Sequence, residues 1–266
     1  MKNLLLISSL FLISACTPMP NKTTHQSIQV PIPNSSLPIS TDAGQIPINQ
    51  VPINPAPPIN MDAKHSKMLA AGERVLGDKK AQLAIDNYFN PIIRDYQATY
   101  RNSQKRLYTA RTQKEYDFYT MTAQKEGRVA HVLSDTWSKA YFLKAYALQE
   151  LKNTTLAKNV LEQALKLSPS NSKYLSEMGH ILHIEKNWNR ALQIYSSAEK
   201  AALFFSPQSK KQKELLRAKR GIGYSLVEMK RLREAEKVYL EILQINPNDK
   251  IAKQELKYLQ ELKKRG

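Results

Sequence analysis

The sequence predicts an all-α body that follows a disordered, proline-rich linker, and three observations lead to this prediction. Ten of the 14 prolines lie before residue 60, and only four follow. Glycine is scarce, with 8 residues in a chain of 266. Residues 61–266 show almost no alternation of apolar and polar side chains, whereas apolar residues recur there at helical spacing. That pattern is typical of helices and disfavours strands.

The first fifteen residues have the features of an export signal. Lys2 precedes an apolar run, 4–13, that is too short to span a bilayer as a permanent helix. The sequence ISAC at 13–16 resembles the lipobox of bacterial lipoproteins. This resemblance implies that residues 1–15 are removed and that Cys16 receives a diacylglycerol and an acyl chain such as palmitate. The alternative is an ordinary signal peptide that happens to contain a cysteine.

Lipidation would also account for the single thiol. Cys16 is the only cysteine in the sequence, so no disulfide within the chain can form. Several acyl chains attach a protein stably to a membrane where one chain does not. Thr17 stands where an aspartate favours retention in the inner membrane in this family, so the resemblance implies anchoring in the outer membrane, facing the periplasm. Apart from this lipid, we expect no cofactor.

Residues 16–60 form the linker. After the cysteine, its only charged side chains are Lys22 and Asp42. A short word ending in Pro-Ile recurs at 30–32, 37–39, 46–48, 51–53 and 57–59. Proline removes backbone donors and pushes the preceding residue into an extended conformation, so we predict local polyproline II structure. The segment would span about 130 Å if extended and about 35 Å as a coil. It would act as a plain tether, or its Pro-Ile words would dock on an aromatic groove.

Residues 137–249 contain three related units, at 138–171, 172–205 and 216–249. The first two align at an offset of 34 residues. The aligned pairs are Ala145 with Gly179, Ala157 with Ala191, Leu161 with Tyr195, and Ala164 with Ala198. The third unit repeats the pattern with Gly223, Ala235, Tyr239, Ile242 and Pro247 after ten extra residues. Repeats of this length indicate a stack of similar structural units.

The pattern resembles the tetratricopeptide repeat, in which small residues stand where the two helices of a pair touch. This resemblance implies a solenoid of helical hairpins, because each hairpin has more apolar surface than it can bury alone. Unit 172–205 carries the pattern most clearly, although it lacks a closing proline. We expect the stretch 206–230 to be a loop followed by a lengthened first helix of the third unit.

The flanks of the repeats are also predicted to be helical. Residues 250–266 form an amphipathic run, which suits a helix that caps the stack. Residues 61–136 show helical spacing and contain a degenerate repeat, in which Ala84 precedes Tyr88 as Ala191 precedes Tyr195. Pro91 predicts a kink or an end in this helix. Eight of the 13 tyrosines fall between 88 and 146, and we expect most to pack between helices, with a ligand-facing patch as the alternative.

Catalytic patterns are weak, and we expect no enzyme. Ser170 and Lys173 fit the Ser-x-x-Lys spacing of serine acyltransferases, but the companion motifs are missing. His180 and His183 share a helix face, as metal-binding pairs do, yet the sequence suggests no third ligand. We therefore predict neither a catalytic residue nor a metal site.

Binding is the better expectation. In the tetratricopeptide family, ligands lie along the concave face, against the first helix of each pair, and this resemblance gives four contact positions in each unit. These positions are Lys139, Phe142, Tyr146 and Gln149, then Lys173, Ser176, His180 and His183, and then Arg217, Arg220, Tyr224 and Val227. Their cations would suit a carboxylate, from an acidic segment or a chain terminus. The alternative is a solvated polar face without a ligand.

The charge balance also favours an anionic partner. Residues 61–266 contain 38 Lys plus Arg against 22 Asp plus Glu, and residues 208–266 contain 16 against 8. Export argues against nucleic acid. We therefore predict an adaptor or assembly scaffold of the cell envelope that binds a protein or peptide and meets the membrane only through its lipid. The alternative is a binder of anionic glycan, lipopolysaccharide or lipid through the basic C-terminal surface.

Overall fold

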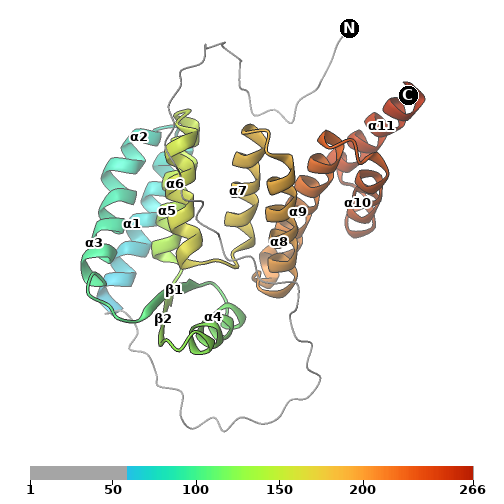
Figure 1. The fold of residues 1–266 in the computed structure, drawn as a ribbon. Coiled ribbons are helices and arrows are strands. Elements are labelled where there is room, and N and C mark those ends of the chain that lie inside the picture. The colour runs from blue at the N-terminus through green and yellow to red at the C-terminus, as the bar shows by residue number, and fades with distance from the viewer. Residues whose placement is uncertain (1–58, 266) are drawn as a thin grey trace, which may run out of the picture.

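The computed structural model describes residues 59–265, so Cys16, the predicted signal and the predicted linker up to residue 58 lie outside the described residues. Residues 59 and 60, which were predicted to end the linker, begin the first helix instead. Antiparallel helix pairs stack side by side and confirm the predicted all-α, tetratricopeptide-type solenoid (Figure 1). The pairs are α1 (Ile59–Gly77) with α2 (Ala81–Ala84) and α3 (Asn90–Thr99), α5 (Thr136–Glu150) with α6 (Thr154–Leu167), α7 (Ser172–Ile184) with α8 (Trp188–Phe204), and α9 (Gln208–Glu228) with α10 (Leu232–Ile245). Helix α11 (Lys250–Arg265) ends the stack. Among the described helices, none is long and apolar enough to cross a membrane.

Helices α2 and α3 form one continuous helix through Pro91. A π-helical segment, Ile85–Phe89, joins them, and Pro91 lies in the first turn of α3. A proline removes one backbone donor from the helix, and a wider π turn is a common local adjustment. The helix therefore continues to Thr99 and does not end at the proline.

Residues 61–136 are not helical throughout, which corrects the sequence prediction. Strands β1 (Arg106–Ala110) and β2 (Ala130–Ser134) pair in parallel, and α4 (Gln113–Lys125) connects them. Each strand has only five residues, too few for a clear alternation in the sequence. An isolated two-stranded sheet is marginally stable, so this β1-α4-β2 insertion depends on its neighbours.

The insertion is fastened to the loops at one edge of the solenoid (Figure 1). The Thr109 hydroxyl donates to Ser138 Oγ at 2.7 Å, and the Ser170 backbone N–H donates to the Tyr119 hydroxyl at 3.0 Å. The Tyr119 ring also stacks on Tyr108, with 4.9 Å between ring centroids. These contacts explain Tyr108 and Tyr119, two of the eight clustered tyrosines, as packing residues.

Small residues let neighbouring hairpins approach closely. The Tyr195 ring of α8 lies between Gly179 of α7 and Gly221 of α9, and a methyl group added at either glycine would overlap the ring. Gly223 meets the Tyr239 ring in the same way. Gly72 of the first hairpin differs, because it meets the Phe89 ring and the Cβ and Cγ atoms of Tyr88. In Gly179–Tyr195, Gly223–Tyr239 and Gly72–Tyr88 the separation is sixteen residues, so the first hairpin keeps the spacing but not the same ring contact.

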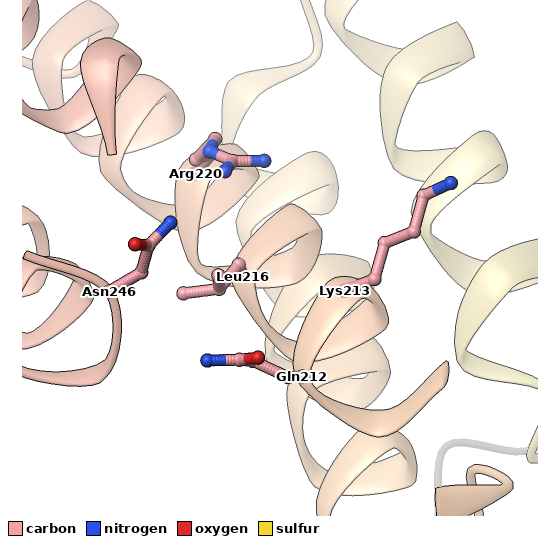
Figure 2. Close-up of a pocket in the computed structure, with 5 residues that line it drawn as sticks. All are labelled: Gln212, Lys213, Leu216, Arg220 and Asn246. Atoms are coloured by element: carbon pink, nitrogen blue, oxygen red, sulfur yellow. The ribbon is translucent and has the colours of Figure 1, made fainter. Parts of the chain in front are cut away.

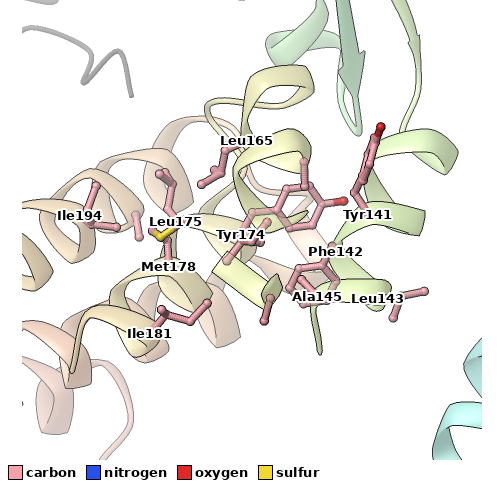
Figure 3. Close-up of a cluster of buried hydrophobic side chains, with 14 of the residues drawn as sticks. Tyr141, Phe142, Leu143, Ala145, Leu165, Tyr174, Leu175, Met178, Ile181 and Ile194 are labelled. Atoms are coloured by element: carbon pink, nitrogen blue, oxygen red, sulfur yellow. The ribbon is translucent and has the colours of Figure 1, made fainter. Parts of the chain in front are cut away.

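The core runs continuously between the hairpins. Figure 3 shows side chains of α5 and α6 meeting those of α7 and α8, and Phe142 stacks on Tyr174 with 4.9 Å between ring centroids. Leu165, Met178 and Ile194 are buried in the same cluster. Helix α9 begins directly after Pro207, so residues 208–215, which separate the second and third units in the sequence, are helical as well.

A lysine adopts the left-handed conformation in every turn that joins the two helices of a pair. These residues are Lys79, Lys152, Lys186 and Lys230, with φ of 62°, 60°, 56° and 60°. In each turn the lysine N–H bonds to the carbonyl three residues back, and the next N–H bonds to the carbonyl five residues back. This is the Schellman motif, whose left-handed position is usually glycine.

Replacing Lys186 by glycine should raise the free energy of unfolding by about 0.5–1 kcal/mol. A left-handed non-glycine residue costs roughly 1–2 kcal/mol, and the greater freedom of glycine in the unfolded chain offsets part of the gain. Urea denaturation measures the change. Lys237→Gly is the control, because Lys237 is exposed and lies in the middle of α10, where glycine should destabilise by about 1 kcal/mol. Equal effects at both positions would contradict the strain argument.

Candidate functional site

Helices α5, α7 and α9, the first helices of three successive pairs, carry all twelve predicted groove residues. The structure divides these residues by exposure. Phe142, Ser176 and Val227 are buried, so these three side chains present little surface to a ligand. Tyr146 is 44% exposed and His180 is also exposed. The surface available to a ligand is therefore narrower than the full set of twelve positions.

Three of the predicted cations are held by carboxylates of this chain. Lys139 Nζ lies 2.9 Å from Glu73 of α1, and Arg217 Nη2 lies 2.5 Å from the buried Glu177 of α7. Arg220 pairs with Asp249, just before α11. These pairs join adjacent hairpins, so each of these cations has a structural role besides any contact with a ligand.

Lys173 differs from the other groove cations. Within the part of the chain that the structure describes, it forms no ion pair, and its Nζ lies 4.4 Å from the centroid of the Phe142 ring. Burial lowers the pKa of Lys173, and the positive charges of Lys139 and Arg217 lower it further. A cation on an aromatic face, partly removed from water and beside other cations, attracts an anion.

The carboxylate of Glu177 links the three helices that carry the predicted groove residues. It accepts hydrogen bonds from Gln149 Nε2 at 3.0 Å and from Arg217. Residue 177 was absent from the predicted site. Its spacing of four residues from Lys173 places both on one helix face, and this was the signal available in the sequence.

The two histidines do not resemble a metal site. His183 Nε2 lies 2.7 Å from Ser225 Oγ, and the His183 ring packs against Tyr195 and Tyr224 with 4.9 Å between centroids. Burial and the neighbouring His180 lower the pKa of His183 to about 4, so this ring is neutral at pH 7. Among residues 59–265, no group of three or more potential ligands of the His, Cys, Asp and Glu types gathers around a point.

A pocket of about 320 Å³ opens beside the first half of α9 (Figure 2). Its lining combines cationic, amide and aliphatic side chains: Gln212, Lys213, Leu216, Arg220 and Asn246. Arg220 is thus shared between this pocket and the ion pair with Asp249. The composition suits a small anionic or hydroxyl-rich group.

Part of the C-terminal positive charge is paired within the fold. Lys219 lies 2.7 Å from both Glu199 and Glu241, and Lys263 lies 2.5 Å from Glu236. Of these three carboxylates only Glu199 lies outside 208–266, so these pairs leave most of the basic excess of that segment uncompensated. Ser170 of the Ser-x-x-Lys pattern is 3% exposed and lies in the loop between α6 and α7.

Comparison with known proteins agrees with the repeat fold. The tetratricopeptide repeat family model matches residues 138–171 and 221–249, so the chain carries these repeats. The pilF protein of Pseudomonas aeruginosa is similar in structure, with a TM-score of 0.53 and 16% identity over 77% of this chain and 72% of that chain. The yeast histone chaperone Hif1, described as a scaffold protein recruiting protein complexes to core histones, has a TM-score of 0.51 and 13% identity over 76% of this chain and 94% of Hif1. At these identities the likeness shows the fold alone. No curated protein sequence matched the chain.

Proposed function

We propose that this protein is an adaptor of the bacterial cell envelope that binds an acidic peptide segment or a free chain terminus in the groove around Lys173. The tetratricopeptide fold supports a role in protein–protein interaction. The observation that carries the proposal is Lys173 itself, a partly buried cation without a carboxylate partner among the described residues. A bound carboxylate would supply that partner.

The neighbours of Lys173 fit such a ligand. Lys139 and Arg217 add positive potential on both sides, while their own partners, Glu73 and Glu177, hold them in place. Tyr146 offers exposed aromatic surface one helical turn beyond Phe142 on the same helix. A peptide with a carboxylate next to an apolar side chain would therefore meet both a charge and a ring.

Replacing Lys173 by methionine should weaken binding of acidic peptides about tenfold to a hundredfold. Methionine keeps the aliphatic packing on Phe142 but removes the charge, and a hydrogen bond to a charged group contributes roughly 1.5–3 kcal/mol. The probe is a pool of peptides with acidic side chains and free C-termini, measured by fluorescence anisotropy beside the same pool with amidated C-termini.

The control for this experiment is Lys166→Met, which removes one exposed positive charge from α6, the second helix of its pair. If the ligand is a terminal carboxylate, only the pool with free C-termini should bind; if it is an acidic segment, both pools should bind. Equal affinities of both variants would refute the groove assignment.

The affinity should also depend on pH. Because the pKa of Lys173 is lowered, the affinity should fall as the pH rises through that pKa, since only the protonated amine attracts the carboxylate.

We also propose that Cys16 is lipidated and anchors the protein in the outer membrane, facing the periplasm, with residues 17–58 as a standoff. The support is the ISAC sequence at 13–16. Cys16→Ala should abolish incorporation of labelled palmitate in cells, because no other cysteine is available. Because Cys16 is the only thiol, labelling that persists in the Cys16→Ala variant would contradict lipidation at this position.

The pocket beside α9 favours one other candidate, binding of an anionic glycan, lipopolysaccharide or lipid group at the basic C-terminal surface. Lys213 and Arg220 would contact its phosphate or carboxylate groups. The dependence of binding on salt concentration distinguishes peptide binding in the groove from binding of an anionic group at the C-terminal surface. Binding led by exposed charges is screened strongly at high ionic strength, whereas binding in the partly buried groove is screened less.

A further inference from the structure

The left-handed lysines lie along a single edge of the solenoid. Lys79, Lys152, Lys186 and Lys230 are all exposed, and one occurs in each turn between the helices of a pair. These turns form the upper edge of the stack in Figure 1. We call the segments 78–80, 151–153, 185–187 and 229–231 the lysine edge. In each turn, a lysine occupies a left-handed backbone position that favours glycine.

The two edges of the solenoid differ in charge. The lysine edge contains six cationic side chains and two carboxylates, Asp78 and Glu185. Lys158 of α6 binds Glu185, and Glu234 of α10 binds Arg231, both at 2.7 Å, so one carboxylate and one cation of this edge are paired with residues of the adjoining helices. The loops of the opposite edge, 168–171, 205–207 and 246–249, contain a single charged residue, Asp249. The β1-α4-β2 insertion occupies part of that opposite edge (Figure 1). Among the short turns and loops that join the helices of the hairpins, positive charge is therefore concentrated on the edge that the insertion leaves open. The segment 100–134, which includes the insertion, contains seven Lys and Arg residues against three Asp and Glu.

Exposed aliphatic side chains lie beside the lysines. Leu151, next to Lys152, is 44% exposed, and Ile184, two residues before Lys186, is 51% exposed. Leu83, three residues after Lys80, is 44% exposed. Lysines alternating with single aliphatic side chains are typical of surfaces that lie on a membrane, because the aliphatic groups enter the headgroup region while the amines remain at the phosphates.

We propose that the lysine edge is a second membrane contact and rests on the anionic surface of a lipid bilayer. The charges are spread over four successive hairpins, which suits a broad negative surface better than a compact ligand. The edge is separate from the groove of α5, α7 and α9, so both can be occupied together. This contact goes beyond the prediction that the lipid on Cys16 is the only link to the membrane.

The left-handed backbone supplies a sharp test. Lys79→Gly, Lys152→Gly, Lys186→Gly and Lys230→Gly combined remove four charges and also remove four strained positions, so weaker binding cannot result from unfolding. The matched control removes four exposed lysines of α4 and α11 by Lys114→Gln, Lys125→Gln, Lys253→Gln and Lys257→Gln. Both sets are placed in the full chain with Cys16→Ser, synthesised without membranes so that no lipid is attached.

Co-sedimentation with vesicles is the measurement. Vesicles of phosphatidylcholine are compared with vesicles of equal parts phosphatidylcholine and phosphatidylglycerol, and the N-terminal segment contributes equally in all variants. We expect the glycine variant to lose at least about tenfold in partitioning onto the anionic vesicles, while the control changes less than about twofold. Asparagine at the same four positions, which also tolerates the left-handed conformation, should behave like glycine. Unchanged partitioning of the glycine variant, or an equal loss in the control, would overturn the proposal.

Discussion

Replacing Arg111 by alanine should lower the free energy of unfolding by about 3–5 kcal/mol. Arg111 Nη2 lies 2.9 Å from Glu115 Oε1, and Nη1 lies 2.9 Å from Glu214 Oε1. Both carboxylates are buried, and the guanidinium is only 7% exposed. Ser206 and the backbone N–H of Arg111 provide further hydrogen bonds to the two carboxylates. Without the guanidinium, two buried negative charges would face each other.

The loss of free energy of unfolding in the Arg111→Ala variant should increase with pH. Burial already raises the pKa of Glu115 in the wild type, although the charge of Arg111 lowers it. Removing Arg111 takes away the stabilising charge, so the pKa in the folded variant rises further above its unfolded value. The folded variant then binds more protons than the unfolded chain, and its stability decreases as the pH rises through the raised pKa. Below the ordinary glutamate pKa of about 4.3, this part of the loss disappears.

Urea denaturation of Arg111→Ala at acidic and neutral pH measures both effects. Arg231→Ala is the control, because Arg231 forms an exposed pair with Glu234 at 2.7 Å and should contribute nothing measurable. A second consequence concerns the groove. Glu214 lies one turn before Arg217 on α9, so loosening this attachment should also weaken peptide binding. Similar stabilities of the two variants at neutral pH would contradict the role given to Arg111.

The contact between Arg111 and Glu214 could not be predicted from the sequence. Arg111 and Glu115 have the helical spacing of four residues, but Glu214 lies 103 residues away, and no local pattern indicates that contact. The hairpins were predictable because small and aromatic residues recur at a fixed offset, and physical packing between adjacent helices requires that recurrence. The strands were not, because five residues supported by tertiary contacts leave little periodic signal.

The groove residues could be predicted only in part. The resemblance to the tetratricopeptide repeat placed Lys173 and Arg217 on first helices, where the structure has them. It could not tell which cations are already paired, since Lys139 and Arg217 meet carboxylates from other hairpins. The sequence alone likewise does not distinguish the lysines of the turns from other surface lysines, whereas their left-handed backbone conformation does.

Replacing Gly221 by alanine should lower the free energy of unfolding by about 2–3 kcal/mol. Inside a helix this substitution normally stabilises, because alanine has the higher helix propensity by about 1 kcal/mol. Here the new methyl group would enter the ring of Tyr195, which is 5% exposed and already in contact with Gly179 on its other side. The ring cannot retreat, so α9 must move away from α8.

The sign of the effect identifies its cause. Gly77→Ala is the matched control, because no atom lies within 4 Å of a methyl group added there, and it should be neutral or stabilising. Tyr195→Ala alone should destabilise by about 3–5 kcal/mol through the cavity that it leaves. Combined with Gly221→Ala, the loss should be smaller than the sum of the two single losses, because the methyl group then occupies space that the ring has vacated. Additive losses, measured by urea denaturation, would mean that Gly221 is needed for another reason than close contact with Tyr195.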